Sequence, residues 1–218
     1  MVATLIIEVT LAGFVFLRHH TTQFGRTAGV VLLLLSTFQL AEYRICTGPD
    51  DGVLAWARIG FVAITLLPIS GLYLVSLISR KPHFLKLGYA TACGFVLYFL
   101  FVPKAITKAV CAGNYVLFNT TTDLYVLYGI YYLGFLLLGS WEGIEQISNY
   151  QRQVPSKQVL QWLIVGYLSF MAPMAVLYIT MPITRNATAS IMCGFAVILA
   201  LILALKVVPL YDRVRAAK

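Results

Sequence analysis

The chain has 218 residues with 16 basic and 8 acidic side chains, and hydrophobic residues make up 60% of it while charged residues make up 11%. Ordinary soluble domains contain about 45–50% apolar and about 25% charged residues, so this composition excludes a soluble globular domain, a disordered chain and a disulfide scaffold. The charges are separated by long apolar runs, the longest extending from Gln158 to Thr184. Runs of about 18 or more apolar residues are what a helix needs to cross a hydrocarbon core. The sequence therefore predicts an all-α polytopic membrane protein.

Seven apolar segments are predicted to span the membrane. In chain order they cover about Val2–Leu17, Thr27–Tyr43, Leu54–Ser79, Phe84–Val102, Asp123–Ile144, Val159–Met181 and Thr188–Pro209. The first segment is short and contains Glu8, and a cleaved signal peptide is its alternative interpretation. The positive residues of a signal peptide precede its apolar region, whereas Arg18, His19 and His20 follow it here, which favours a span.

Lysine and arginine are unevenly distributed over the predicted connections. One set of connections, together with the segment after Pro209, holds more of them than the other set. Because cytoplasmic loops carry the excess of Lys and Arg, we expect the N-terminus outside and the C-terminus in the cytoplasm. The net charge of +8 then reflects membrane topology and attachment to an anionic leaflet, and it does not indicate nucleic-acid binding.

Spans two to four resemble spans five to seven, which predicts an internal repeat. Unit A covers about 27–104, unit B about 123–209, and an extra span at 1–18 precedes them. The matched pairs include Trp56 with Trp162, Gly60 with Gly166, Pro68 with Pro173, Tyr73 with Tyr178, Cys93 with Cys193 and Glu42 with Glu145. Because each unit has three spans, successive units would enter the membrane from opposite sides, as an inverted repeat. The alternative is a shared membrane-helix composition without a repeat.

Three glutamates are the most informative candidates for a functional site. Glu42 is predicted at the outer mouth of the second span, with Arg44 and Arg58 near enough to form ion pairs. Glu142 and Glu145 are predicted near the inner mouth of the fifth span, on one helix face because they are three residues apart. Two neighbouring carboxylates repel each other, which favours coupling to a proton or a cation. The alternative for this pair is a position at the headgroups, paired with basic residues.

Prolines and tyrosines complete the predicted path through the membrane. They are Pro68, Pro173, Tyr73, Tyr178, Tyr128 and Tyr132. A proline inside a helix frees a backbone carbonyl group, which then needs a partner or a cavity. Tyrosine hydroxyl groups need hydrogen-bond partners when buried, and they would line a polar path or hold a flat ligand. The alternative is that both groups of residues only shape helix packing.

Two of the four cysteines, Cys46 and Cys111, fall in loops on the same predicted side. A disulfide between them is one interpretation if that side is oxidising, and two free thiols are the other. All three histidines fall in connections, which argues against an intramembrane metal centre or a Ser–His dyad, and hence against an enzyme. No cofactor or metal is predicted.

The first functional hypothesis is a small carrier or channel with a path at the repeat interface, between spans three and six, possibly coupled to protons or cations. An inverted repeat favours it because alternating access needs two equivalent gates. The alternatives are a seven-helix sensor or ligand-binding module acting through a partner protein, and an accessory subunit of a membrane complex. The predicted partners are the lipid bilayer and either a second copy or another membrane protein, with no nucleic acid.

Overall fold

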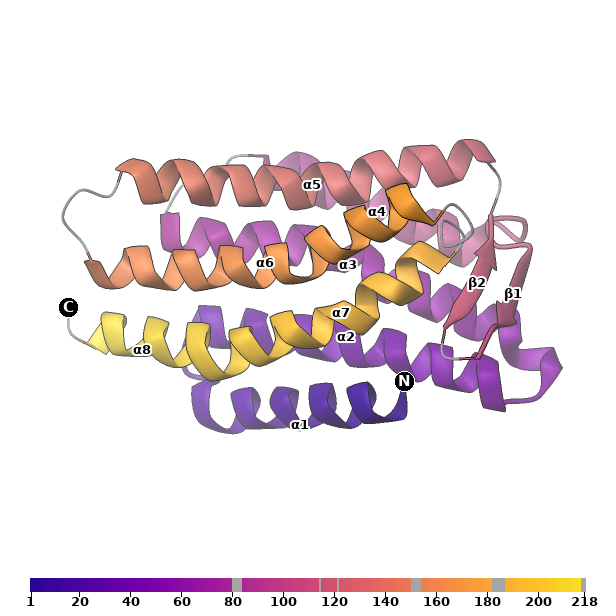
Figure 1. Cartoon of the computed structure of the whole chain (residues 1–218), viewed down its shortest axis with the longest axis horizontal. Helices are drawn as coiled ribbons and strands as arrows, with labels where there is room; N and C mark the ends of the chain where they lie inside the picture. The colour runs from indigo at the N-terminus through magenta and orange to yellow at the C-terminus, as the bar shows by residue number, and fades with distance from the viewer. Residues whose placement is uncertain (80–83, 114, 121, 150–153, 182–186, 217–218) are drawn as a thin grey trace.

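The computed structural model describes residues 1–79, 84–113, 115–120, 122–149, 154–181 and 187–216. This part of the chain forms a bundle of long helices lying side by side, with a two-stranded hairpin at one end (Figure 1). The helices are α1 Val2–His19, α2 Gln23–Thr47, α3 Val53–Ser79, α4 Leu85–Phe101, α5 Thr122–Asn149, α6 Val154–Thr180, α7 Thr188–Ile202 and α8 Val208–Ala216. A short 3-10 turn covers Asp50–Gly52, and the strands are β1 Lys108–Cys111 and β2 Val116–Asn119.

Five helical segments in the described residues are long and apolar enough to cross a membrane. They are Val2–His19, Gln23–Thr47, Val53–Ser79, Ser156–Thr180 and Thr188–Ala216, and α4 is a shorter apolar helix. The prediction of a helical membrane protein is confirmed at this level. Apart from terminal residues, six of the seven predicted segments fall on one helix each, although several helices extend past the predicted bounds, as α2 does on both sides. The seventh, Thr188–Pro209, covers α7, a π-helical turn and the start of α8.

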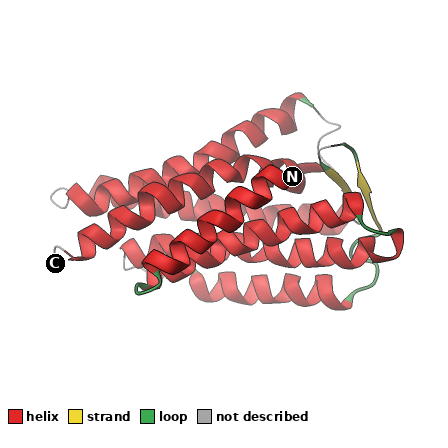
Figure 2. Ribbon diagram, turned by 90° about the horizontal axis from the view of Figure 1, so that it is seen from below, coloured by secondary structure: helices red, strands yellow, loops and turns green. Residues whose placement is uncertain are grey.

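The β-hairpin is an exception to the all-α prediction. Strands β1 and β2 are antiparallel, with Lys108 opposite Asn119, and the hairpin covers one end of the bundle (Figure 2). Val116 and Phe118 of β2 are buried while their neighbours are more exposed, which is the period-two pattern of a half-buried strand. The Phe118 ring meets the Phe61 ring of α3 edge to face, with 5.1 Å between the ring centroids. The hairpin is therefore packed onto the bundle by its apolar face.

A disulfide joins Cys46, near the end of α2, to Cys111 of β1, with 5.2 Å between the two Cα atoms. The hairpin is thus attached to the bundle both by packing and by a covalent bond. Gly113, between the strands, has a φ of 72°, in the left-handed region where a side chain is disfavoured.

Helix α3 is the central element of the bundle, because it packs against α2, α4 and α5. Helix α1 packs along α2, and α6 packs along α7. A two-fold axis that relates α2–α4 to α5–α7 would exchange α2 with α5 and α3 with α6. The contact between α3 and α5 would then be repeated between α6 and α2. The described residues show no α2–α6 contact of that extent, so the helix packing gives the predicted repeat no support of its own.

A π-helical turn, Leu203–Val207, connects α7 to α8. The Val208 backbone N–H donates to the carbonyl oxygen of Leu203, five residues back, instead of four. Pro209 follows directly and has no N–H for a normal helical bond. The π-helical turn therefore lies next to a position where one backbone hydrogen bond of a regular helix is lost because of the proline. The helix nevertheless continues from α7 into α8.

Candidate functional site

A pocket of about 750 Å³ lies near the hairpin end of the bundle. Helices α3, α5, α6 and α7 line it, together with residues of α4 and β2. Its volume lies within the range of about 300–1,000 Å³ that is usual for small-molecule sites. The lining is mostly carbon, and Tyr128, Tyr132 and Tyr178 are among the few side chains that bring oxygen atoms to it. The pocket is therefore shaped for a largely apolar molecule.

The pocket reaches the outside of the bundle at α5 and α6, where several of its lining residues are exposed. Ile130 and Leu133 of α5 line it and are 66% and 45% exposed, and Ile179 of α6 lines it and is 76% exposed. In a membrane these exposed side chains face hydrocarbon, because no water is available at that depth. An apolar ligand could therefore enter sideways from the bilayer.

One wall of the pocket is a rigid aromatic cluster. The Phe61 and Phe99 rings lie 4.8 Å apart between centroids, and the Phe99 and Tyr128 rings meet at 89° with centroids 5.3 Å apart. Such tilted and edge-to-face pairs stabilise by more than their buried area alone. The lining also contains Met174 and Met192, whose unbranched side chains can adapt to different shapes.

Thr65 fixes the tyrosines of α5 to α3. The Tyr131 hydroxyl donates to the Thr65 carbonyl oxygen at 2.6 Å, and the Tyr128 hydroxyl lies 3.1 Å from the Thr65 hydroxyl. The Thr65 hydroxyl donates its own proton to the carbonyl oxygen of Phe61 at 2.6 Å, so Tyr128 must be the donor in the second contact. Two of the tyrosine hydroxyls are thus used in packing α5 onto α3.

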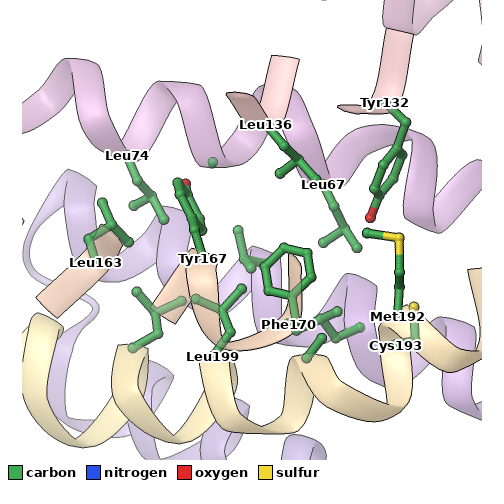
Figure 3. A pocket seen from close by; sticks show the side chains of 15 residues that line it. Leu67, Leu74, Tyr132, Leu136, Leu163, Tyr167, Phe170, Met192, Cys193 and Leu199 are labelled. Carbon is green, nitrogen blue, oxygen red and sulfur yellow. The ribbon is translucent and has the colours of Figure 1, made fainter. Parts of the chain in front are cut away.

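The predicted path between α3 and α6 is occupied by side chains. A cavity of about 30 Å³ lies there, and Figure 3 shows leucine side chains around Tyr167 and Phe170 and the Tyr132 ring directed toward Met192. The Tyr167 hydroxyl is buried without a hydrogen-bond partner among the described residues. It lies so close to Gly71 that an added Cβ atom there would be 2.5 Å from it. This interface is closed and apolar in the structure.

Two carboxyl groups are buried inside the bundle, within reach of Ser190 and Cys193 of α7. Glu42 of α2 is 1% exposed and Glu8 of α1 is 0% exposed, and they interact electrostatically. Cys193 of α7 lines the pocket and lies within electrostatic range of both carboxyl groups. Glu8 was not predicted as a site residue, because its charge was interpreted only as evidence against the first segment being a membrane span. An ionisable side chain inside a membrane helix is itself the signal that could have found it.

The arginines predicted to pair with Glu42 lie elsewhere. The Arg44 guanidinium lies over the Trp56 ring, 5.5 Å from its centroid, and the Arg58 Nη2 atom donates to the Pro103 carbonyl oxygen at 3.0 Å. Among the described residues Glu42 forms no ion pair with either of them. Burial of the carboxyl group inside the bundle separates it from side chains that extend to the surface.

The other predicted site residues are spread over the bundle. Glu145 is exposed and Glu142 half-buried, both toward the end of α5 far from the hairpin. Tyr73 of α3 is within electrostatic range of Tyr89 of α4. It is not among the residues that line the pocket. Pro68 is buried in α3. Pro173 lies in the stretch of α6 that forms a pocket wall, between Met171 and Met174.

Neither protein-family models nor curated protein sequences match this chain. In the part of the chain that the structure describes, no three His, Cys, Asp or Glu side chains gather to hold a metal ion. The function therefore has to be inferred from the pocket and the buried carboxyl groups.

Proposed function

We propose that this chain is a multi-helix membrane protein that binds an apolar, lipid-sized ligand in the pocket near the hairpin and acts as a sensor or binding module through a partner protein. The single observation that supports this most is the pocket itself: about 750 Å³, lined mainly by carbon and reaching the outside of the bundle at α5 and α6. Tyr178 and Tyr132 would hydrogen-bond a single polar group on such a ligand.

Helix α7 would transmit a structural change caused by ligand binding to the other end of the bundle. Met192 and Cys193 line the pocket, and the same continuous helix leads through the π-helical turn to α8. There His19 Nδ1 lies 2.6 Å from Asp212 Oδ2, and the Thr22 hydroxyl donates to Asp212 Oδ1 at 3.2 Å. A ligand that shifts α7 would therefore act on the contact between α8 and the α1–α2 connection, where a partner could detect it.

Glycines in the pocket lining offer a direct test. Gly129 and Gly134 line the pocket, and a Cβ atom added at either would meet nothing within 4 Å. Gly129→Phe and Gly134→Phe should therefore fold and fill the pocket. We expect a large loss of binding of an apolar fluorescent probe to the purified chain, by more than about tenfold in Kd. Gly94→Phe is the matched control, because Gly94 is equally open but lies outside the pocket lining. Equal probe binding by all three variants would refute the pocket proposal.

The finer topology is part of the proposal: seven crossings, with the N-terminus outside, the C-terminus in the cytoplasm and an inverted repeat. The excess of Lys and Arg in one set of connections supports the orientation. Single cysteines at Asp51 and Arg213, with Cys93 and Cys193 replaced and the disulfide retained, should react with an impermeant reagent from opposite sides of the membrane, Asp51 from outside. Reaction of both from one side would overturn the orientation.

A carrier or channel is the second candidate, and the buried carboxyl group of Glu42 is the observation that favours it. An intramembrane acid is costly and usually serves ion or proton movement. Flux of protons or cations into liposomes that contain the purified chain would favour this candidate, provided that Glu42→Gln reduces the flux. Liposomes that remain tight would leave the binding module as the better account.

A further inference from the structure

The buried pair Glu8 and Glu42 is a feature that ligand binding in the pocket does not require. Glu8 is 0% exposed, and neither of its carboxyl oxygens has a hydrogen-bond partner among the described residues. Glu42 is 1% exposed, and its Oε1 atom is also without a partner. Burying one ionised carboxylate without compensation is expensive, and burying two beside each other is more so. Something positive must therefore balance this pair, either a shared proton or a bound cation.

Neutral polar side chains lie near the two carboxyl groups in the helix register. Thr4 lies one turn before Glu8 on α1, and Gln39 lies one turn before Glu42 on α2. The Thr4 hydroxyl lies 3.0 Å from Gln39 Oε1 and 2.7 Å from the Met1 carbonyl oxygen. Both helices thus place a carboxylate and a neutral oxygen on the face that they share. Carboxylate, amide and hydroxyl oxygens are the ligands that hard cations prefer.

Helix α7 contributes a third side through Ser190. The Val116 backbone N–H donates to the Ser190 hydroxyl oxygen at 3.1 Å, which leaves the hydroxyl proton available for Glu42, its other partner. The hairpin therefore fixes Ser190, and Ser190 fixes Glu42. Helices α1, α2 and α7 thus each bring an oxygen-bearing side chain to this region.

Few other charged groups face the pair. Cys193 of α7 and the amino group of Met1 lie within electrostatic range of it. The amino group gives Glu8 no hydrogen bond, since both Glu8 oxygens are without a partner. Among the described residues no Lys, Arg or His side chain forms an ion pair with either carboxyl group. Among the described residues the Met1 amino group offsets the two carboxylates only in part, and a cation bound between them would supply the remaining positive charge.

We propose that Glu8 and Glu42 form a binding site for a hard divalent cation, with Ca²⁺ as the first candidate. The two carboxylates supply the charge, and oxygen atoms of Gln39, Thr4 and Ser190 complete the coordination together with water. Ca²⁺ accepts six to eight oxygen ligands in flexible geometry, which suits a site assembled from three helices. A bound ion would hold α1, α2 and α7 together.

Thermal unfolding of the purified chain, first stripped of metal by a chelator, tests this site. At constant ionic strength, Ca²⁺ should raise Tm progressively with the logarithm of its concentration above Kd, by about 5–10 °C at a hundredfold excess over its Kd. Na⁺ and K⁺ should give no comparable rise in Tm. The Ca²⁺ effect should weaken at acidic pH, because the ligands must be ionised to bind the ion.

Variants assign the effect to the pair. Glu8→Gln and Glu42→Gln should each abolish the rise in Tm that Ca²⁺ causes, while Asp51→Asn, which removes an exposed acid outside the site, should retain it. Should either glutamine variant fail to fold, Glu8→Asp keeps the charge and should weaken the Kd for Ca²⁺ by about tenfold or more. No Ca²⁺ shift in the wild type would overturn the site in favour of a shared proton. A shift that Glu8→Gln leaves intact would overturn it equally. Probe binding in the pocket is a separate measurement, so failure here leaves the proposed function standing.

Discussion

Single residues decide how the tyrosines of α5 are used. The Thr65 hydroxyl oxygen accepts a hydrogen bond from the Tyr128 hydroxyl, and the Thr65 backbone carbonyl oxygen accepts one from the Tyr131 hydroxyl. One short polar side chain on α3 thus satisfies one tyrosine and positions the wall of the pocket. A buried hydroxyl that loses its partner costs more than the net value of the hydrogen bond it made.

Thr65→Val preserves the shape of the side chain and removes its hydroxyl group. We expect the free energy of unfolding to fall by about 1 kcal/mol, since Tyr128 loses its acceptor inside the bundle. Thr91→Val is the control, because the Thr91 hydroxyl bonds only to carbonyl groups of its own helix. Equal effects of the two substitutions would show that the contact between α3 and α5 contributes nothing special.

Among the elements, α8 is the one whose position depends on a few contacts. The Tyr211 ring stacks on the Phe24 ring with 4.3 Å between centroids, and Asp212 meets His19 and Thr22. Thr22 also caps α2, since its hydroxyl oxygen accepts the Gly25 backbone N–H at 3.0 Å. The Thr22 side chain therefore links the start of α2 to α8.

Asp212→Asn should loosen α8 without unfolding the bundle. The contact between His19 and Asp212 is partly exposed, so we expect a stability loss of only about 0.5–1 kcal/mol. Hydrogen exchange of the amide groups of residues 208–216 should rise, while α3 stays protected. If exchange in this segment is unchanged, the contact is not what holds α8 in place.

At the scale of the whole molecule, apolar run length was enough to predict the helices. It works because a membrane helix must satisfy its backbone internally and therefore needs an unbroken apolar run. The hairpin was missed because Val116 and Phe118 are too few to stand out between longer apolar runs. The pocket could not be predicted, since it depends on how α5, α6 and α7 pack. Tyr128, Tyr132 and Tyr178 were proposed as site residues and do line it, whereas Tyr73, predicted by its match in the repeat, faces α4.

The acids show the same limit of sequence reasoning. Glu42 was singled out as an unusual carboxylate and is buried in the structure, but its predicted partners were chosen by their proximity in the sequence. The structure brings Glu8 to it instead, from a helix that packs along α2. Contacts between helices depend on which faces meet, and apolar periodicity specifies this poorly when a helix is apolar on every side.

The central claim is that the pocket near the hairpin holds an apolar ligand. Native mass spectrometry of the chain, extracted from its membrane in mild detergent, measures this most directly. We predict one bound lipid-sized molecule per chain that survives detergent exchange in the wild type and in Gly94→Phe and is absent in Gly134→Phe. A bare chain in all three samples, or an equal bound mass in Gly134→Phe, would contradict the account.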